Sequence, residues 1–265
     1  MDVELVKVSH LNLSVDGMQI CPDTNLSLKR HRGYLIAGPI EKANVFLLRV
    51  IGGIHPPQYH HQQARVLFQG LDMYESRESV IKEIKKKIAF VFCEGTLISN
   101  LTIKENLLLP LQYHYPGYDD AAVMEKINED FNYFGIPDVL QKRPAEISYD
   151  VRKKLAFIRA SLQEPELILM DKPLFNLDEH ERDQVIQYLE NLKSNGITFT
   201  IFSRCVSVLE PLIDEAILLE EGKHPTIIAK NDQEFESLSR SRFLRSWGRN
   251  GIGSRAISPG ENNGF

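Results

Sequence analysis

The sequence lacks several features that mark whole classes of protein. Its three cysteines, Cys21, Cys93 and Cys205, are scattered, which argues against a disulfide framework or a cysteine-based zinc site. No run of residues approaches the roughly 18–20 apolar positions that a membrane-spanning helix needs. The first ten residues, MDVELVKVSH, lack the pattern of a secretory signal. We therefore expect a cytoplasmic protein with reduced thiols and no resident metal ion.

The sequence also lacks an excess of basic residues. Its 265 residues include 31 Lys and Arg against 36 Asp and Glu, which gives a formal net charge of −5. A protein that binds nucleic acid usually carries a basic surface, so no nucleic acid partner is expected. Hydrophobic residues make up 43% of the chain and charged residues 25%, as in ordinary globular domains.

Short apolar runs alternate with helical patterns along the chain. The runs at 34–37, 167–170 and 199–202 are almost continuously apolar, which is typical of parallel strands covered on both faces. The order of strands and helices predicts an α/β domain with a mostly parallel sheet. Strands are predicted at Val3–Val8, Gly33–Ala37, Ala64–Phe68, Ile88–Phe92, Leu167–Met170, Thr198–Phe202 and Glu215–Glu220, and helices at Asn44–Ile51, Glu179–Ser194 and Val206–Leu212.

Two further segments define the expected domain organisation. The interval at about 101–163 is mainly helical in pattern and is interpreted as an inserted subdomain. The tail over 248–265 is rich in Gly, Ser and Asn, so we expect it to be flexible. Residues 1–247 would then form one domain.

The segment YLIAGPIEKANVFLLRVIGG, from Tyr34 to Gly53, has the outline of a phosphate-binding loop without its chemistry. The loop pattern is G-x-x-x-x-G-K-[ST], in which backbone N–H groups cradle the phosphates. Counted from Gly38, the second glycine falls on Ala43, the lysine on Asn44 and the hydroxyl residue on Val45. By itself the segment is either a nucleotide site that has lost its residues or a strand–turn–helix that never held a nucleotide.

A second stretch favours the lost nucleotide site. EISYDVRKKLAFIRASLQEPELILMDKPLFNLD, at 146–178, resembles without a gap the stretch from the signature motif to the D-loop of ATP-binding-cassette (ABC) ATPases. Residues 147–151 stand at the signature LSGGQ, Asp171 at the Walker B aspartate and Asp178 in the D-loop. The resemblance extends over nearly the whole chain. It implies a P-loop NTPase fold of the ABC type: a RecA-like parallel core, an N-terminal antiparallel β-subdomain and an inserted helical subdomain.

Compared with the family pattern, most groups that bind and hydrolyse ATP are replaced. Lys172 stands where the family has the general base, and a protonated lysine cannot accept a proton from the attacking water. Losing one such group often costs about 10²–10³ in turnover, so negligible hydrolysis is predicted. No cofactor is expected, with ATP and Mg²⁺ as the alternative. The other positions are Gly38, Pro39, Ile40, Glu41, Lys42, Ala43, Asn44 and Val45 in the phosphate loop, Val15 at the adenine, Cys93 at the Q-loop, Ser148, Tyr149, Asp150 and Val151 in the signature, and Arg204 at or beside the switch histidine.

The replacements predict an internal ion network. Glu41 brings a negative charge to the loop that would hold phosphate, and Lys172 and Arg204 bring positive charges to where Mg²⁺ and the base would lie. We predict that these three residues and Asp171 form a network that fills the pocket, because unpaired buried charges are costly. The alternative is that the side chains point into solvent and the pocket is empty.

The resemblance also implies partners. Family members work with a transmembrane permease subunit and a second ATP-binding subunit, as homo- or heterodimers, on the inner face of the cytoplasmic membrane. The segments LLRVIGG and LLLPLQYH are most similar to ATP-binding subunits of the lipid-asymmetry (Mla) type, which transport phospholipids. The prediction is a degenerate ATP-binding subunit that serves as a scaffold or regulatory partner. Two alternatives stay open: an active ATPase in which Lys42 replaces the missing lysine, and a soluble interaction module derived from the same fold.

Overall fold

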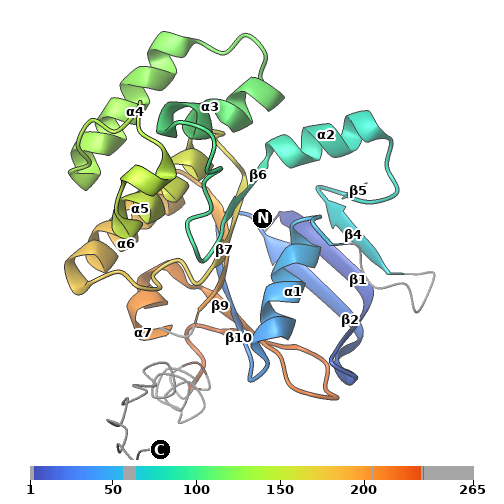
Figure 1. Cartoon of the computed structure of the whole chain (residues 1–265). Coiled ribbons are helices and arrows are strands. Elements are labelled where there is room, and N and C mark those ends of the chain that lie inside the picture. The colour runs from blue at the N-terminus through green and yellow to red at the C-terminus, as the bar shows by residue number, and fades with distance from the viewer. Residues whose placement is uncertain (1–2, 56–63, 204–205, 234, 236–265) are drawn as a thin grey trace, which may run out of the picture.

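The computed structural model describes residues 3–55, 64–203, 206–233 and 235, which form two sheets flanked by helices (Figure 1). One sheet has the order β2-β1-β4-β5 and the other the order β10-β9-β3-β8-β7-β6. The strands are β1 (Glu4–Val15), β2 (Met18–Lys29), β3 (Gly33–Ala37), β4 (Arg65–Phe68), β5 (Leu71–Asp72), β6 (Ile88–Val91), β7 (Leu167–Asp171), β8 (Thr198–Phe202), β9 (Glu215–Leu218) and β10 (Thr226–Ala229). The helices are α1 (Glu41–Ile51), α2 (Glu78–Lys86), α3 (Ile103–His114), α4 (Asp120–Phe134), α5 (Tyr149–Ser161), α6 (Glu179–Ser194) and α7 (Val206–Leu209), with short 3₁₀ helices η1 (Pro144–Glu146) and η2 (Glu210–Leu212).

The smaller sheet is antiparallel and contains the N-terminal part of the chain. Strands β1 and β2 pair over their 12-residue lengths, and β4 pairs with the other edge of β1. Asp16 and Gly17 form the tight turn between β1 and β2, with φ values of 52° and 83°. Two successive positive φ angles are typical of the turns that suit the twist of a hairpin. The turn carries the Asp16 side chain toward α1, where it matters for the site below.

The larger sheet has a parallel core. Strand β3 runs parallel to β8 on one side and β9 on the other, and β7 and β6 continue the sheet, with β10 as an antiparallel edge. All five residues of β3 are buried, and so are all five of β8. The prediction that the nearly continuous apolar runs are parallel strands is therefore confirmed.

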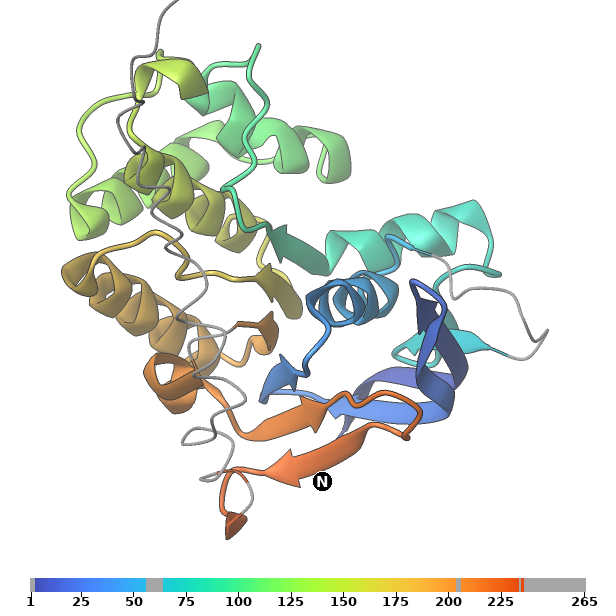
Figure 2. The same cartoon turned by 60° about the horizontal axis from the view of Figure 1, so that its bottom comes forward.

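Alternate residues of β3 enter two hydrophobic clusters on opposite faces of the sheet. Leu35 and Ala37 pack with residues of α3, α4, α5 and α6 on one face. Tyr34 and Ile36 pack with α1 and the antiparallel sheet on the other. Figures 1 and 2 show α1 between the two sheets, and α3, α4 and α5 grouped at one end of the molecule. In the described part of the chain, no helix combines the length and the apolar character needed to span a bilayer.

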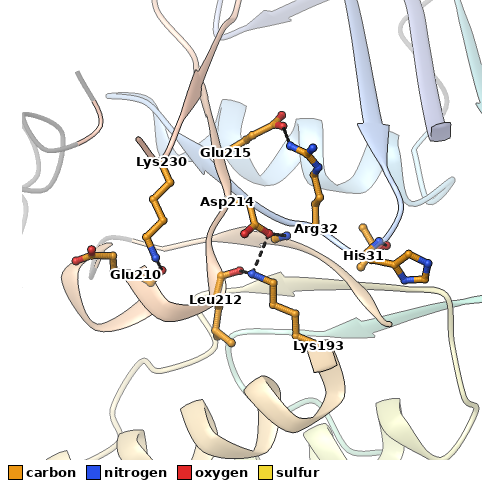
Figure 3. A network of polar contacts seen from close by, with 10 residues as sticks. His31, Arg32, Lys193, Glu210, Leu212, Asp214, Glu215 and Lys230 are labelled. Atoms are coloured by element: carbon orange, nitrogen blue, oxygen red, sulfur yellow. Dashed lines mark hydrogen bonds and ion pairs between the residues drawn. The ribbon is translucent and has the colours of Figure 1, made fainter. Parts of the chain in front are cut away.

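A polar network fixes the amino-terminal ends of β3 and β9 (Figure 3). Lys193 of α6 donates from Nζ to the Leu212 carbonyl at 2.9 Å and lies 2.8 Å from Asp214 Oδ2. The same carboxylate accepts the N–H of Gly33 at 2.7 Å. A Cβ at Gly33 would lie 1.7 Å from the Leu212 carbonyl oxygen, so only glycine fits this close approach. The network also contains the ion pair of Arg32 with Glu215 and a hydrogen bond from Lys230 to the Glu210 carbonyl.

Several predicted boundaries are wrong. The first strand runs on to Val15, because the hairpin continues past Val8. The predicted helix at 206–212 consists of α7 followed by the 3₁₀ turn η2, which has a proline in its first turn. Helix α1 begins at Glu41 and not at the predicted Asn44.

Candidate functional site

Helix α1 occupies part of the segment that would be a phosphate loop. The backbone N–H groups of Ala43 and Asn44 donate to the Ile40 carbonyl at 3.0 and 3.2 Å. In a phosphate-binding loop, N–H groups at such positions point at the phosphates. The prediction that the helix starts at Asn44 is wrong because Glu41, Lys42 and Ala43 are good helix formers. The Glu41 carboxylate also stabilises the positive end of its own helix.

Asn44, at the position of the phosphate-binding lysine, points back into the fold. It is fully buried, and its Nδ2 donates to the Gly38 carbonyl at 3.0 Å. Its Oδ1 has no hydrogen-bond partner among the described residues. A Cβ on Gly38 would lie 2.6 Å from the Leu219 carbonyl oxygen and 2.9 Å from this Oδ1. Close packing therefore explains Gly38 without any phosphate.

Lys172 and Glu41 form an ion pair across the candidate site. Lys172 directly follows β7 with a φ of 44°, and its ammonium contacts the Glu41 carboxylate. Their side chains are 20% and 32% exposed, so the pair is partly shielded from water. The ammonium also lies 5.8 Å from the centroid of the Phe202 ring, within reach of a cation–π attraction. This part of the predicted ion network is confirmed, whereas Arg204 lies outside the described residues.

Asp171, at the Walker B position, ends β7 beside this pair. Burial raises the pKa of its carboxyl, the Lys172 ammonium lowers it and the Glu41 carboxylate raises it, so the overall shift is upward. Its Oδ1 is buried and has no hydrogen-bond partner among the described residues. Those residues contain no group of three or more His, Cys, Asp or Glu that could hold a metal ion. Val45 supplies no ligand atom and Lys172 is a competing cation, so the donors present do not fit Mg²⁺.

A second lysine links three of the motif positions. Lys153 of α5 is fully buried, and its Nζ donates to the Cys93 carbonyl and, at 3.1 Å, to the Lys172 carbonyl. The Tyr149 hydroxyl donates to the same Cys93 carbonyl at 3.1 Å. The Q-loop, Walker B and signature positions are thus joined by side chains of one chain. Burial lowers the pKa of Lys153 to about 8 and raises that of the Cys93 thiol, which disfavours a reactive thiolate.

The signature segment begins α5. Ser148 is the residue before the helix, and Tyr149, Asp150 and Val151 form its first turn. Burial by itself would raise the pKa of Asp150, but hydrogen bonds from Ser148 and from the backbone N–H groups of Asp150 and Val151 lower it overall. The carboxylate therefore occupies the positive end of the helix, where the family binds a phosphate.

Asp178, at the D-loop position, caps α6. Its Oδ1 accepts the N–H of Glu181 at 2.8 Å, and the Glu181 carboxylate accepts the N–H of Asp178 at 3.1 Å. This reciprocal arrangement is a capping box, which satisfies two N–H groups at the helix start. Within the chain, Asp178 therefore stabilises the start of α6.

Lys42 points away from the Glu41–Lys172 pair. Its Nζ lies 2.7 Å from Asp16 Oδ2 in the β1–β2 turn, and both side chains are mostly exposed. A cavity of about 540 Å³ lies between this turn and α1. Its lining consists of Ser14, Val15, Asp16, Glu41, Lys42, Val45, Phe46 and Arg49. Val15, at the position where the family has a ring that stacks on adenine, is aliphatic, and the aromatic residue of this lining is Phe46 of α1.

Sequence reasoning missed Lys153 and the Lys42–Asp16 pair. The one signal for Lys153 is its position: it opens the run KKLAFI, which is mostly apolar and lies in the interval predicted to be mainly helical. Its partners are carbonyl groups at Cys93 and Lys172, and backbone groups leave no trace in a sequence. Asp16 is 26 positions from Lys42, so their contact depends on how the hairpin packs against α1.

Comparison with known proteins gives a consistent picture. A family model described as ABC transporter matches residues 24–175, which is more than half of the chain. The molybdenum import ATP-binding protein ModC of Albidiferax ferrireducens is 28% identical over 203 residues, 76% of this chain and 53% of that protein. The spermidine/putrescine import ATP-binding protein PotA of Thermotoga maritima is 25% identical over 219 residues, 82% of this chain and 56% of that protein. The chain thus spans about half the length of these relatives.

A third relative and two solved structures extend the likeness. The methionine import ATP-binding protein MetN of Clostridioides difficile is 22% identical over 242 residues, 91% of this chain and 73% of that protein. An ATP-binding cassette solved as a dimer with ADP and Pi has a TM-score of 0.74 at 22% identity, covering 86% of this chain and all of the other. An ATP-binding subunit of an ABC transporter has a TM-score of 0.75 at 17% identity, covering 92% and 98%. These likenesses confirm the predicted fold class.

Proposed function

Because this chain belongs to the family of ABC transporter ATP-binding proteins, we propose that it is a degenerate member that hydrolyses little or no ATP. Its role is that of a scaffold or regulatory subunit in a transporter. One observation carries the proposal: the Lys172 ammonium, at the general-base position, pairs with the Glu41 carboxylate of the phosphate-loop segment. Charged groups of the chain itself stand where the family binds the charged groups of ATP and Mg²⁺.

Three physical consequences support this role. The Glu41 carboxylate repels a triphosphate, because like charges at short range are unfavourable in a partly buried pocket. The N–H groups of Ala43 and Asn44 are already bonded within α1, so they cannot donate to phosphate without unwinding the helix. Lys172 cannot accept the proton of an attacking water while it is an ammonium.

The signature segment supports a non-catalytic role toward a partner as well. In the family, each ATP site joins the Walker motifs of one chain to the signature of the other. Here Asp150 holds a negative charge at the start of α5 and would repel the terminal phosphate of a partner's ATP. A homodimer would therefore have two inactive sites, and a heterodimer would present an intact partner with a damaged signature whose one useful group is Ser148.

The contacts of Lys42 oppose the active-ATPase alternative. Its ammonium is paired with Asp16 of the β1–β2 turn, 2.7 Å away. To serve a phosphate it would have to leave Asp16 and reach past Glu41, which already holds Lys172. Lys42 therefore does not replace the missing lysine in this proposal.

The wider assignment follows the family. The proposed partners are a transmembrane permease subunit and a second ATP-binding subunit, which would hold the chain on the inner face of the cytoplasmic membrane. The relatives are named for molybdenum, methionine and spermidine/putrescine import. We propose phospholipid as the cargo class on the likeness of 47–53 and 107–114 to Mla-type subunits. Residues 1–247 would form one ABC domain with a helical subdomain at about 101–163, followed by a flexible tail at 248–265.

Two measurements test this function. Phosphate release from Mg-ATP by the purified chain should not exceed that of a protein-free blank, and Lys42→Ala should not change it. Turnover that Lys42→Ala abolishes would overturn the proposal in favour of an active enzyme. The tagged full chain should also co-purify from membranes with a multi-spanning protein. Monomeric behaviour without such a protein would favour an interaction module instead.

A further inference from the structure

A second cavity lies at the opposite end of the parallel strands from the candidate site. Strands β7 and β8 begin there with Leu167 and Thr198, whereas Asp171 is at the other end of β7. The cavity has a volume of about 380 Å³, which is enough for a small molecule. We call it the rear cavity. Its lining comes from the β2–β3 turn, α4, the end of α5 with the loop after it, and the segment between α6 and β8, and it includes Arg30, Lys126, Glu166, Leu192, Ile197 and Thr198.

Thr198 brings a buried hydroxyl group to this cavity. The residue is 1% exposed, and its Oγ1 accepts the backbone N–H of His31 at 2.9 Å. Among the residues that the structure describes, the proton of this hydroxyl has no acceptor. A buried donor without an acceptor is costly, and native structures rarely leave one unpaired. The Thr198 hydroxyl can therefore donate to a molecule in the cavity.

Glu166, the carboxylate of the cavity wall, already has partners within the chain at both of its oxygens. Its Oε2 lies 2.7 Å from Arg30 Nη1 and accepts a hydrogen bond from Gln69. Its Oε1 lies 2.9 Å from Lys87 Nζ. Burial by itself would raise the pKa of Glu166, but the hydrogen bonds and charges of these partners lower it overall. Glu166 is therefore ionised and needs no further cation.

The cationic donors of the cavity are not used up by these contacts. Arg30 has five side-chain N–H groups, and Glu166 contacts one of its nitrogens. The Lys126 ammonium has three N–H groups, and its ion-pair partner Glu164 lies 3.3 Å away with a side chain that is 82% exposed. Such exposed pairs are weak, so Lys126 can turn to a ligand at little cost. The local charge is +1, from three positive groups (Arg30, Lys87 and Lys126) and two negative ones (Glu164 and Glu166).

The lining also contains apolar side chains. Leu192 and Ile197 are half-buried and pack against the hydrophobic cluster shared with α3, α4, α5 and α6. Pro165 of the same lining is buried. These side chains offer no hydrogen bond, so a hydrated inorganic ion gains nothing from them. A hydrocarbon group placed against them would be removed from water, which is favourable.

We propose that the rear cavity binds a small organic carboxylate whose short apolar body packs on Leu192 and Ile197. The carboxylate accepts hydrogen bonds from the Thr198 hydroxyl and from the cationic groups of Arg30 and Lys126. A monoanion matches the local charge of +1, whereas a cation would find Glu166 already paired. A phosphate dianion would exceed this charge and would leave the apolar side chains without a partner.

The position of the cavity makes such a ligand an effector. Lys126 belongs to α4, whereas Arg30 lies in the turn after β2 and Thr198 begins β8. A carboxylate that bonds all three ties α4 to the two sheets. Such an effector site goes beyond the proposed function, because it gives a regulatory subunit a small-molecule signal and does not depend on nucleotide binding.

Saturation-transfer NMR with the purified full chain and hexanoate tests the proposal. Hexanoate should bind saturably with a Kd of about 1 mM, as expected for a ligand of few atoms. Hexanamide, which has the same body without the charge, should bind about tenfold more weakly, because charge-assisted hydrogen bonds are lost. Lys126→Gln and Thr198→Val should each weaken hexanoate binding by about three- to tenfold.

Two control variants make the same substitutions outside the cavity. Lys104→Gln removes an exposed lysine of α3, and Thr200→Val removes a buried hydroxyl from the same strand as Thr198. Both should bind hexanoate as the native chain does. Circular dichroism checks that the variants fold, and Lys126→Gln decides the outcome by itself should Thr198→Val not fold.

Four results would overturn the proposal. They are no saturable binding of hexanoate, equal binding of hexanamide, unchanged binding in Lys126→Gln or in a folded Thr198→Val, and an equal loss in the control variants. Inorganic phosphate that displaces hexanoate at concentrations below the Kd of hexanoate would also overturn it and would identify an inorganic anion site. Nucleotide is absent from the assay, so its outcome is independent of whether the chain binds or hydrolyses ATP.

Discussion

Lys172 and Glu41 are 131 positions apart in the sequence and form an ion pair in the structure. Lys172 follows strand β7, and Glu41 starts helix α1 after strand β3, which is separated from β7 by β8 in the sheet. The pair therefore joins the two elements between which the family holds ATP and Mg²⁺. It gives each charge a partner within the chain, as a folded protein without nucleotide requires.

The energy of this pair can be measured by a double-mutant cycle. Glu41→Gln, Lys172→Met and the double variant should give a coupling energy of about 1–2 kcal/mol, because the pair is partly buried. Unfolding in urea supplies the free energies. The matched control is the exposed Asp16–Lys42 pair, whose coupling should be below about 0.5 kcal/mol because water screens it. Equal couplings for the two pairs would mean that the Glu41–Lys172 contact has no special role.

Lys153 should make stability depend on alkaline pH. Burial lowers its pKa from 10.5 to about 8, so between these values the unfolded chain binds the proton that the folded chain has released. The free energy of unfolding should therefore rise with pH over this range, and Lys153→Met should remove the rise. Below about pH 8 the free energy of unfolding of the Met variant should lie within about 1 kcal/mol of that of the native chain. Both carbonyl groups keep a donor, because the Tyr149 hydroxyl still donates to the Cys93 carbonyl and the Phe175 N–H still donates to the Lys172 carbonyl. A Met variant that retains the alkaline rise would assign it to another group.

Asp130 should have the opposite effect at acid pH. It lies on α4, accepts a hydrogen bond from the Tyr188 hydroxyl at 3.2 Å, and burial raises its pKa from 3.8 to about 6. Between these values the folded chain holds a proton that the unfolded chain has lost, so stability should fall as pH rises through this range and stay lower above it. Asp130→Asn should abolish this fall and be stabilising near neutral pH by about 1 kcal/mol. Denaturation curves across the range check it. Glu125→Gln, at an exposed position of the same helix whose charge does not contribute to the Asp130 shift, should keep the native pH profile.

The parallel core could be predicted because burial of a strand on both faces requires a continuous apolar run, which is visible in the sequence. Strands β3 and β8 are buried on both faces, so every residue in them is apolar or small, and their bounds follow from the sequence. Helix α6 also has its predicted bounds, since Asp178 and Glu181 supply a capping box that marks its start. The family resemblance then supplied the arrangement of sheets that local patterns cannot give.

The site could be predicted only in part. The pairing of Glu41 with Lys172 followed from the opposite charges at two aligned motif positions. The start of α1 could not be predicted in this way, because the phosphate-loop pattern predicts a loop up to Ala43. In the structure these positions are helical, since Glu41, Lys42 and Ala43 are good helix formers and the glycines of the loop pattern are absent. Lys153 could not be anticipated, because its partners are carbonyl groups brought close by the packing of α5.

The central claim is that the chain's own groups close the nucleotide site, and calorimetric titration with Mg-ATP tests it most directly. The native chain should give no saturable heat up to millimolar ATP and no rise in melting temperature. The variant Glu41→Gly/Ala43→Gly/Asn44→Lys/Val45→Ser/Lys172→Glu restores the loop pattern and the base, and it should gain measurable binding. Saturable binding of Mg-ATP to the native chain at micromolar to sub-millimolar affinity would contradict the claim.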